Sequence, residues 1–146
     1  MERARREAGV AGRADLGDLA HGRPVQASTA KEPERSPQRA VDGDPQTRWT
    51  SEYADNQWLI VDLGAPRELS HVEIRWEVAF AETYTLHKSN DGITWTTLAA
   101  ERGRAGWVVT RLPPRSTARW VRVFGQKRAT KFGFSIWELR VYGVTA

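Results

Sequence analysis

Gln57-Trp58-Leu59-Ile60-Val61-Asp62-Leu63-Gly64 is the stretch that decides the fold of this 146-residue chain. It is apolar on both faces and ends at a glycine, which is typical of a central strand covered on both sides. The next segment, residues 68–77, alternates cleanly, with Val72, Ile74 and Trp76 on one face and polar residues on the other. Two adjacent strands of this kind indicate a β-sheet domain.

Further strands are predicted outward from this pair. Asn90-Asp91-Gly92 is a strong hairpin turn, and Pro113-Pro114 separates two late strands. The chain has no long helical pattern and no repeat of 20–50 residues, so it is predicted to be all-β, an antiparallel sandwich or barrel. The remaining predicted strands are 24–29, 83–89, one starting at Trp95, 107–112, 118–125 and 134–142.

The composition excludes several kinds of site. There are seven tryptophans but no cysteine, so disulfides, zinc–thiolate sites and cysteine nucleophiles are all excluded. Three histidines are too few and too scattered for a multi-histidine metal site. No apolar stretch approaches the ~20 residues of a membrane span, and no apolar segment follows the N-terminal arginines as in a secretory signal.

The sequence also indicates the domain boundary and the charge distribution. Residues 1–18 are interpreted as a poorly ordered tail or linker, and residues 19–146 as one domain. The net charge is +4, with the basic residues concentrated after residue 100. They are spread over several segments and form no run of five, so nucleic-acid binding is not expected.

Residues 40–49 read Ala-Val-Asp-Gly-Asp-Pro-Gln-Thr-Arg-Trp and form a tight acidic turn. Asp42 and Asp44 present hard oxygen ligands of the kind that calcium prefers. The alternative is a surface turn whose aspartates cap their own backbone. The residues alone leave both readings open.

The order of segments resembles the coagulation factor V/VIII type C (discoidin) family, and most closely its family 32 carbohydrate-binding modules. The resemblance covers residues 19–143 and implies a jelly-roll β-sandwich of two antiparallel sheets. Its segments are Gly22–Ser28, Ala40–Trp49, Gln57–Gly64, Arg75–Glu77, Ser89–Gly92, Trp120–Val123 and Phe132–Gly143.

The same resemblance implies a structural calcium ion between the acidic turn and the last strand. A mixture of carboxylate, hydroxyl and carbonyl oxygens suits an ion that takes six to eight ligands. The implied ligands are the Arg39 carbonyl, Asp42, Asp44, Thr47, and Glu138 with a nearby main-chain oxygen at Trp137.

Sugar binding is expected from three loops that the resemblance places at one rim, namely residues 48–56, 77–82 and 126–134. Aromatic faces and charged side chains on such loops suit sugar rings and hydroxyls. The predicted ligand-binding residues are Arg48, Glu52, Tyr53, Glu77, Phe80, Arg128, Lys131, Phe132 and Phe134.

Structural roles remain open for several of these aromatic and charged residues. Arg48 could instead pair with Asp44 or Glu138, and Glu77 could be a plain solvated carboxylate. The roles of Trp107 and Trp120 are left open. The other tryptophans are assigned to core packing, because tryptophan is mostly buried: Trp49, Trp58, Trp76, Trp95 and Trp137.

The predicted function is a non-catalytic carbohydrate-binding module of the chitosan or β-glucan type. Glu52 and Glu77, with Glu32 or Glu34, could meet the ammonium groups of an amino sugar. Phenylalanine replaces the family's usual tyrosine at 132 and 134, which removes two hydroxyls. Expected partners are a polysaccharide or oligosaccharide and a catalytic domain in the same parent chain, at a secreted or cell-surface location.

An adhesion module and an enzyme are the alternatives to a carbohydrate-binding module. An adhesion module binding protein or an anionic membrane would use Arg128 and Lys131-Phe132, but the flanking cysteines of that branch are absent, so membrane binding is not expected. A glycosidase would need a carboxylate pair such as Glu52 and Glu77. No triad or phosphate-cradling loop accompanies that pair, so the domain is not expected to be an enzyme.

Overall fold

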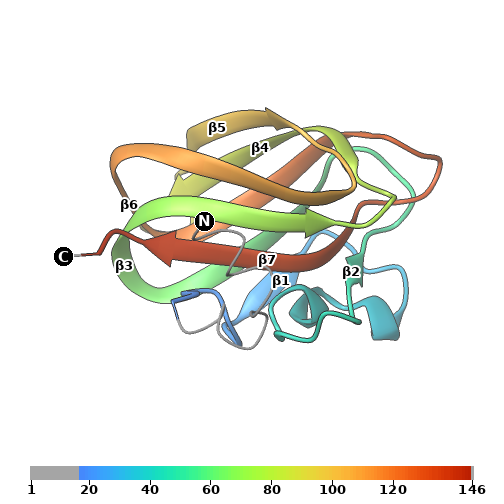
Figure 1. Ribbon diagram of the computed structural model, residues 1–146, viewed down its shortest axis with the longest axis horizontal. Coiled ribbons are helices and arrows are strands. Elements are labelled where there is room, and N and C mark those ends of the chain that lie inside the picture. Colours follow the sequence, from blue (N-terminus) through green and yellow to red (C-terminus); the bar gives the residue numbers. More distant parts are fainter. Residues whose placement is uncertain (1–16, 146) are drawn as a thin grey trace.

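A computed structural model describes residues 17–145 as an antiparallel β-sandwich with two short 3-10 helices (Figure 1). The jelly-roll prediction is confirmed. The elements are β1 (Val25–Ala27), η1 (Pro33–Arg35), η2 (Pro37–Ala40), β2 (Trp49–Thr50), β3 (Gln57–Trp76), β4 (Ala81–Ser89), β5 (Thr96–Arg102), β6 (Gly106–Arg128) and β7 (Ser135–Gly143).

The strands follow the order β2-β7-β3-β6-β4-β5, and β1 pairs with β3. Two pairs of predicted strands are in fact single long strands: β3 joins 57–63 to most of the predicted 68–77 and ends at Trp76, and β6 joins 107–112 to 118–125. Both long strands curl over at one end of the molecule (Figure 1). Their mutual register shifts between Asp62 and Arg67, where Gly64 has φ +91°. The bend lets each long strand contribute to both layers.

The core lies between the layers and is built by alternation. Leu59 and Val61 of β3 pair with Val123 and Val121 of β6, and all four are buried. Opposite residues in an antiparallel pair point to the same face, so these side chains meet inside the sandwich.

Only part of the tryptophan prediction is confirmed. Trp49 and Trp76 are buried at 1% and 2% exposure, as expected for core residues. Trp58, Trp95 and Trp137 are half-buried and do not belong to the core, so that assignment is wrong for them. Trp58 is one residue out of phase with buried Leu59, so it points to the outer face of its sheet.

The N-terminal edge of the domain lies slightly earlier than predicted. Asp18, assigned to the tail, accepts hydrogen bonds from the Val141 amide and the Ala20 amide at 2.9 Å. The Leu19 amide also donates to the Val141 carbonyl at 2.7 Å. The rest of the predicted tail, residues 1–16, lies outside the described residues. Within 17–145 we find no helix with the length and apolar character to cross a membrane.

Candidate functional site

The three predicted loops meet at one end of the sandwich, the right-hand end in Figure 1. The Ser51 amide donates to the Phe134 carbonyl at 2.9 Å, which joins the first loop to the third. The Ala129 amide donates to the Phe80 carbonyl at 3.1 Å, which joins the third loop to the second. Backbone hydrogen bonds therefore hold three loops that are distant in sequence together as one rim.

An exposed aromatic pair stands on this rim. The rings of Tyr53 and Phe132 meet edge to face, with centroids 5.5 Å apart and planes at 83°. Both side chains are nearly half exposed, at 48% and 46%. Lys31 Nζ lies 4.5 Å from the Tyr53 ring centroid, and Lys131 Nζ lies 5.5 Å from that of Phe132. The pair forms an amphipathic surface of the kind that receives sugar rings.

Ion pairs fix the charged groups around the aromatic pair. Arg128 Nε donates to Asp55 Oδ1 at 2.9 Å, and the Arg128 amide donates to the same oxygen at 3.0 Å. These bonds hold the pKa of the Asp55 carboxyl below its ordinary value. Arg128 Nη1 also donates to the Lys131 carbonyl at 3.2 Å. Arg128 therefore braces the loop that carries Phe132.

The carboxylates predicted to face a ligand are partly engaged already. Glu52 Oε1 lies 3.7 Å from Lys31 Nζ, a loose and exposed pair. Glu77 is half-buried, and its Oε1 accepts the Ala79 amide at 2.9 Å. Its other carboxylate oxygen has no hydrogen bond within the described chain. Phe80 belongs to the second loop but is only partly exposed, since it packs against the core.

Two of the predicted ligand-binding residues lie apart from the rim residues around Tyr53 and Phe132. Phe134 is 1% exposed, so the prediction that it contacts a ligand is wrong. Its ring fills the space over Gly125, where an added Cβ would lie 2.6 Å from Phe134 Cε1. Arg48 stacks over the Trp137 ring at 5.1 Å from its centroid, and its Nε donates to Thr50 Oγ1 at 3.3 Å. Arg48 directly precedes β2, and Trp137 lies on β7, so Arg48 is placed away from Tyr53 and Phe132.

Sequence reasoning missed Lys31 and Asp55. Lys31 approaches Glu52 and Tyr53 because its amide donates to the Thr50 carbonyl at 2.7 Å, which brings the 31–38 loop to the rim. Asp55 lies in the predicted first loop, but its partner Arg128 is 73 residues away. The partners of both residues are far away in sequence, so no local sequence pattern predicts either contact.

The acidic turn gathers oxygens around the Thr47 hydroxyl. Thr47 Oγ1 donates to Asp42 Oδ2 at 2.6 Å and lies 3.4 Å from the Arg39 carbonyl and 3.3 Å from that of Asp44. The aspartates also cap their own backbone, since Asp42 Oδ1 accepts the Asp44 amide and Asp44 Oδ1 accepts the Gln46 amide. The aspartates therefore do cap their own backbone, as the alternative predicted. The same turn also brings several oxygens together around the Thr47 hydroxyl.

Glu138 is buried beside this turn at 4% exposure, and its Oε1 has no hydrogen-bond partner in the part of the chain that the structure describes. Burial raises the pKa of Glu138 to about 8, opposed by Arg140 and reinforced by Asp18 and Asp42. A buried carboxyl with an unpaired oxygen is costly unless a cation or proton compensates it. Among residues 17–145, no three His, Cys, Asp or Glu side chains cluster as metal ligands, so a cation here would also need the carbonyl and hydroxyl oxygens.

The chain is similar to known proteins in sequence and in fold. Residues 24–139 match the model of the F5/8 type C domain family. Chitosan-binding module 1 of a Paenibacillus sp. IK-5 chitosanase/glucanase is 39% identical, with a TM-score of 0.82 over 86% of this chain and 98% of that one. Module 2 of the same enzyme, solved with chitotriose, is 34% identical, with a TM-score of 0.83 over 86% of this chain and 100% of that one.

A curated relative is much longer than the matched region. The polysaccharide lyase 8 family protein HylA of Enterococcus faecalis is 34% identical over 76 residues. That match spans 52% of this chain but only 6% of the lyase. The similarity therefore concerns a small part of that protein.

Proposed function

Because the chain belongs to the F5/8 type C domain family, we propose that it is a non-catalytic carbohydrate-binding module that attaches a larger protein to polysaccharide. The main observation that supports this proposal is the exposed ring pair of Tyr53 and Phe132. Such rings offer apolar faces to the C–H surface of a sugar, while charged groups beside them orient its hydroxyls. An open rim of this kind binds without enclosing a reacting bond, which favours binding over catalysis.

Chitosan is the ligand class we propose. Two modules that bind chitosan or chitotriose are 39% and 34% identical to this chain over most of its length. The free oxygen of Glu77 can accept a charge-assisted hydrogen bond from a glucosamine ammonium. Glu52 can do the same when the ligand displaces Lys31, because their exposed pair at 3.7 Å is weak.

The affinity of one module is expected to be low, with a dissociation constant of about 0.1–1 mM, because an open rim buries little area. Useful attachment then comes from repeated modules or from a linked catalytic domain. We place such a domain in the same parent chain, and we place the protein outside the cell or on its surface, where polysaccharide is found.

Calcium is proposed as a structural ion at the acidic turn. The unpaired Glu138 oxygen and the oxygens around Thr47 support it. The residues that would hold it are Arg39, Asp42, Asp44, Thr47, Trp137 and Glu138, with main-chain oxygens from Arg39, Asp44 and Trp137. When bound, the ion would neutralise the buried carboxylates and join the turn to β7.

Calorimetric titration with chitosan oligosaccharides tests the sugar proposal. Binding should weaken by about tenfold in Glu77→Gln, which loses a charge-assisted bond but keeps the side-chain shape. Thr117→Ala is the control, since Thr117 is an exposed residue of β6 with only a main-chain link to Lys88. Absence of binding to chitosan by the wild type would overturn the proposal.

An adhesion role at an anionic membrane is the alternative. Val78 is 66% exposed on the second loop, beside the basic third loop that carries Phe132. Sedimentation with phosphatidylserine vesicles discriminates the two. Vesicle binding without chitosan binding would replace the sugar proposal with this one.

A further inference from the structure

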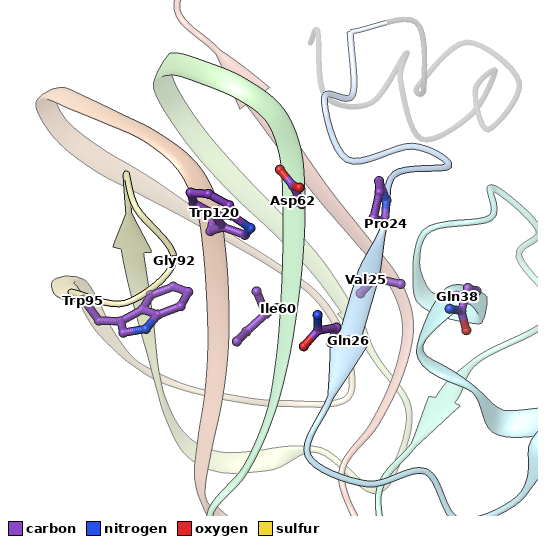
Figure 2. A pocket seen from close by; sticks show the side chains of 9 residues that line it. All are labelled: Pro24, Val25, Gln26, Gln38, Ile60, Asp62, Gly92, Trp95 and Trp120. Carbon is purple, nitrogen blue, oxygen red and sulfur yellow. The ribbon is translucent and has the colours of Figure 1, made fainter.

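A second concave site lies on the outer face of the sheet formed by β1, β3 and β6 (Figure 2). It has a volume of about 500 Å³, within the usual range for ligand pockets. The β4–β5 hairpin closes one side through Gly92 and Trp95, and η2 contributes Gln38 on the other. The lining residues are Pro24, Val25, Gln26, Gln38, Ile60, Asp62, Gly92, Trp95 and Trp120.

This sheet pocket is separate from the rim. Trp120 precedes Arg128 by eight residues in β6, which corresponds to about 26 Å along an extended strand. Trp120 pairs with Ser89 at the end of β4, next to the hairpin that carries Trp95, whereas Arg128 of the rim pairs with Ala81 at the start of β4. A ligand in the sheet pocket therefore contacts none of the Tyr53 and Phe132 surface.

Two tryptophans give the pocket an apolar wall, with Ile60 between them and the rest of the site (Figure 2). The Arg122 guanidinium lies 4.2 Å from the Trp95 ring centroid, and that of Arg119 lies 4.4 Å from that of Trp120. A cation over an indole stabilises that ring orientation. The rings are therefore held in place before any ligand arrives, which lowers the entropic cost of binding.

The polar groups of the pocket are of the kind that hydrogen-bond hydroxyls. The side-chain amides of Gln26 and Gln38 are exposed and have no hydrogen-bond partner within residues 17–145. Asp62 is fixed by Arg119, whose Nε and Nη2 donate to its two oxygens at 2.8 and 3.0 Å. Oδ1 also accepts the Gly64 amide at 2.8 Å, so Oδ2 is the carboxylate oxygen that retains a lone pair for a further hydrogen bond.

The charged residues around the sheet pocket distinguish between cationic and neutral saccharides. Asp62 is neutralised by Arg119, and Arg23 donates to the Asp62 carbonyl at 3.3 Å. Arg122 donates to His87, whose pKa is lowered by burial and by Arg122. Within residues 17–145, Arg122 has no carboxylate partner. The anionic Asp91 lies beside Gly92 in the hairpin. Three arginines against two aspartates still leave the surroundings net positive, which disfavours a polymer carrying ammonium groups but not an uncharged sugar.

We propose that the sheet pocket is a second saccharide-binding site, which takes the neutral hexose residues of a polysaccharide. A hexose ring would lie against Trp95 and Trp120, and its hydroxyls would bond to Gln26, Gln38 and Asp62. The chain would then carry two sites of different charge preference, with glucosamine at the rim and neutral hexose on the sheet. The two sites share no lining residue, so either can bind its ligand without the other.

Heteronuclear NMR titration of the full chain tests the proposal with laminarihexaose, cellohexaose and mannohexaose, each to about 10 mM so that millimolar affinity is visible. At least one of them should shift the indole N–H signals of Trp95 and Trp120 and the side-chain amides of Gln26 and Gln38. Trp95→Ala should weaken this binding by about tenfold. Phe132→Ala should leave it unchanged, because it alters only the rim.

Two outcomes overturn the proposal. One is that none of the three neutral oligosaccharides shifts the Trp95 and Trp120 signals. The other is that Trp95→Ala, folded by circular dichroism, binds them as the wild type does. If Trp95→Ala does not fold, Gln38→Ala at an exposed position replaces it, with the same expected loss of the Trp95 and Trp120 shifts. Failure of chitosan binding at the rim, by contrast, affects only the proposed function.

Discussion

The ring of Tyr53 stands edge to face against the ring of Phe132, across the gap between the first and third rim loops. Because these rings supply the apolar surface of the rim, Phe132→Ala should weaken chitosan binding by about tenfold. The free energy of unfolding should change little, since Phe132 is 46% exposed. Calorimetric titration and thermal unfolding measure the two effects separately.

The matched control for that change is Val109→Ala. Val109 is also an exposed apolar residue, at 44%, but it lies on β6 opposite Glu73 of β3. It should bind chitosan as the wild type does. Equal losses in both variants would show that general surface hydrophobicity, not the ring pair, drives binding.

Arg128 is expected to position the loop of Phe132. Asp55→Asn removes the charge that holds Arg128 Nε, and Arg128 in turn holds the Lys131 carbonyl. The exposed pair adds little to stability, so the melting temperature should stay nearly constant. Chitosan affinity should fall by about threefold, because the Phe132 loop is less well ordered. An unchanged affinity would show that the ion pair does not organise the loop.

Gly125 is required by the packing of Phe134. A Cβ at this position would lie 2.6 Å from Phe134 Cε1, and the ring is fully enclosed. Gly125→Ala should therefore lower the free energy of unfolding by about 1–3 kcal/mol in denaturant titration. Gly17→Ala is the control, because its Cβ would meet nothing nearer than 3.5 Å. Comparable stability of the two variants would contradict this account.

The sequence predicted the strands well where alternation was regular. Residues 71–76 alternate and form the end of β3, and the turn at residues 90–92 separates β4 from β5. A bulge between Leu69 and His71 shifts the phase, so both Leu69 and Val72 are buried. The continuity of β3 was not predicted, because Gly64 reads as a strand end. In the fold it is a bend with positive φ inside one strand.

The site was predictable only in outline. The three loops meet as expected, yet Phe134 turns inward because Gly125, nine positions earlier on β6, leaves room for its ring. Trp95 and Trp120 were not identified as binding residues. Alternation predicts that Trp120 leaves the core, and Arg119, which holds its ring, is adjacent in sequence. Arg122, which holds the Trp95 ring, is 27 residues away from it, so only the fold brings those two together.

Glu138 makes the stability of the metal-free protein fall as pH rises. Its pKa is about 8 in the folded chain and 4.5 as an ordinary glutamate, so the folded state binds more protons than the unfolded state between these values. Asp18 acts in the same direction, with its pKa raised to about 6 by burial. In chelator, the stability contributed by these two groups should therefore be greatest below about pH 4 and decline as the pH rises to 8.

Calcium should reverse that trend, because the ion requires the deprotonated carboxylate. Added calcium should raise the melting temperature more at pH 8 than at pH 5. Glu138→Gln should flatten the pH dependence in chelator, gain on the order of 2 kcal/mol at pH 8 relative to the metal-free wild type, and lose most of the response to calcium. Asp55→Asn, whose carboxylate lies on the rim, should keep that response. A calcium response that Glu138→Gln retains in full would place the ion elsewhere and leave the buried carboxyl as a protonated structural group.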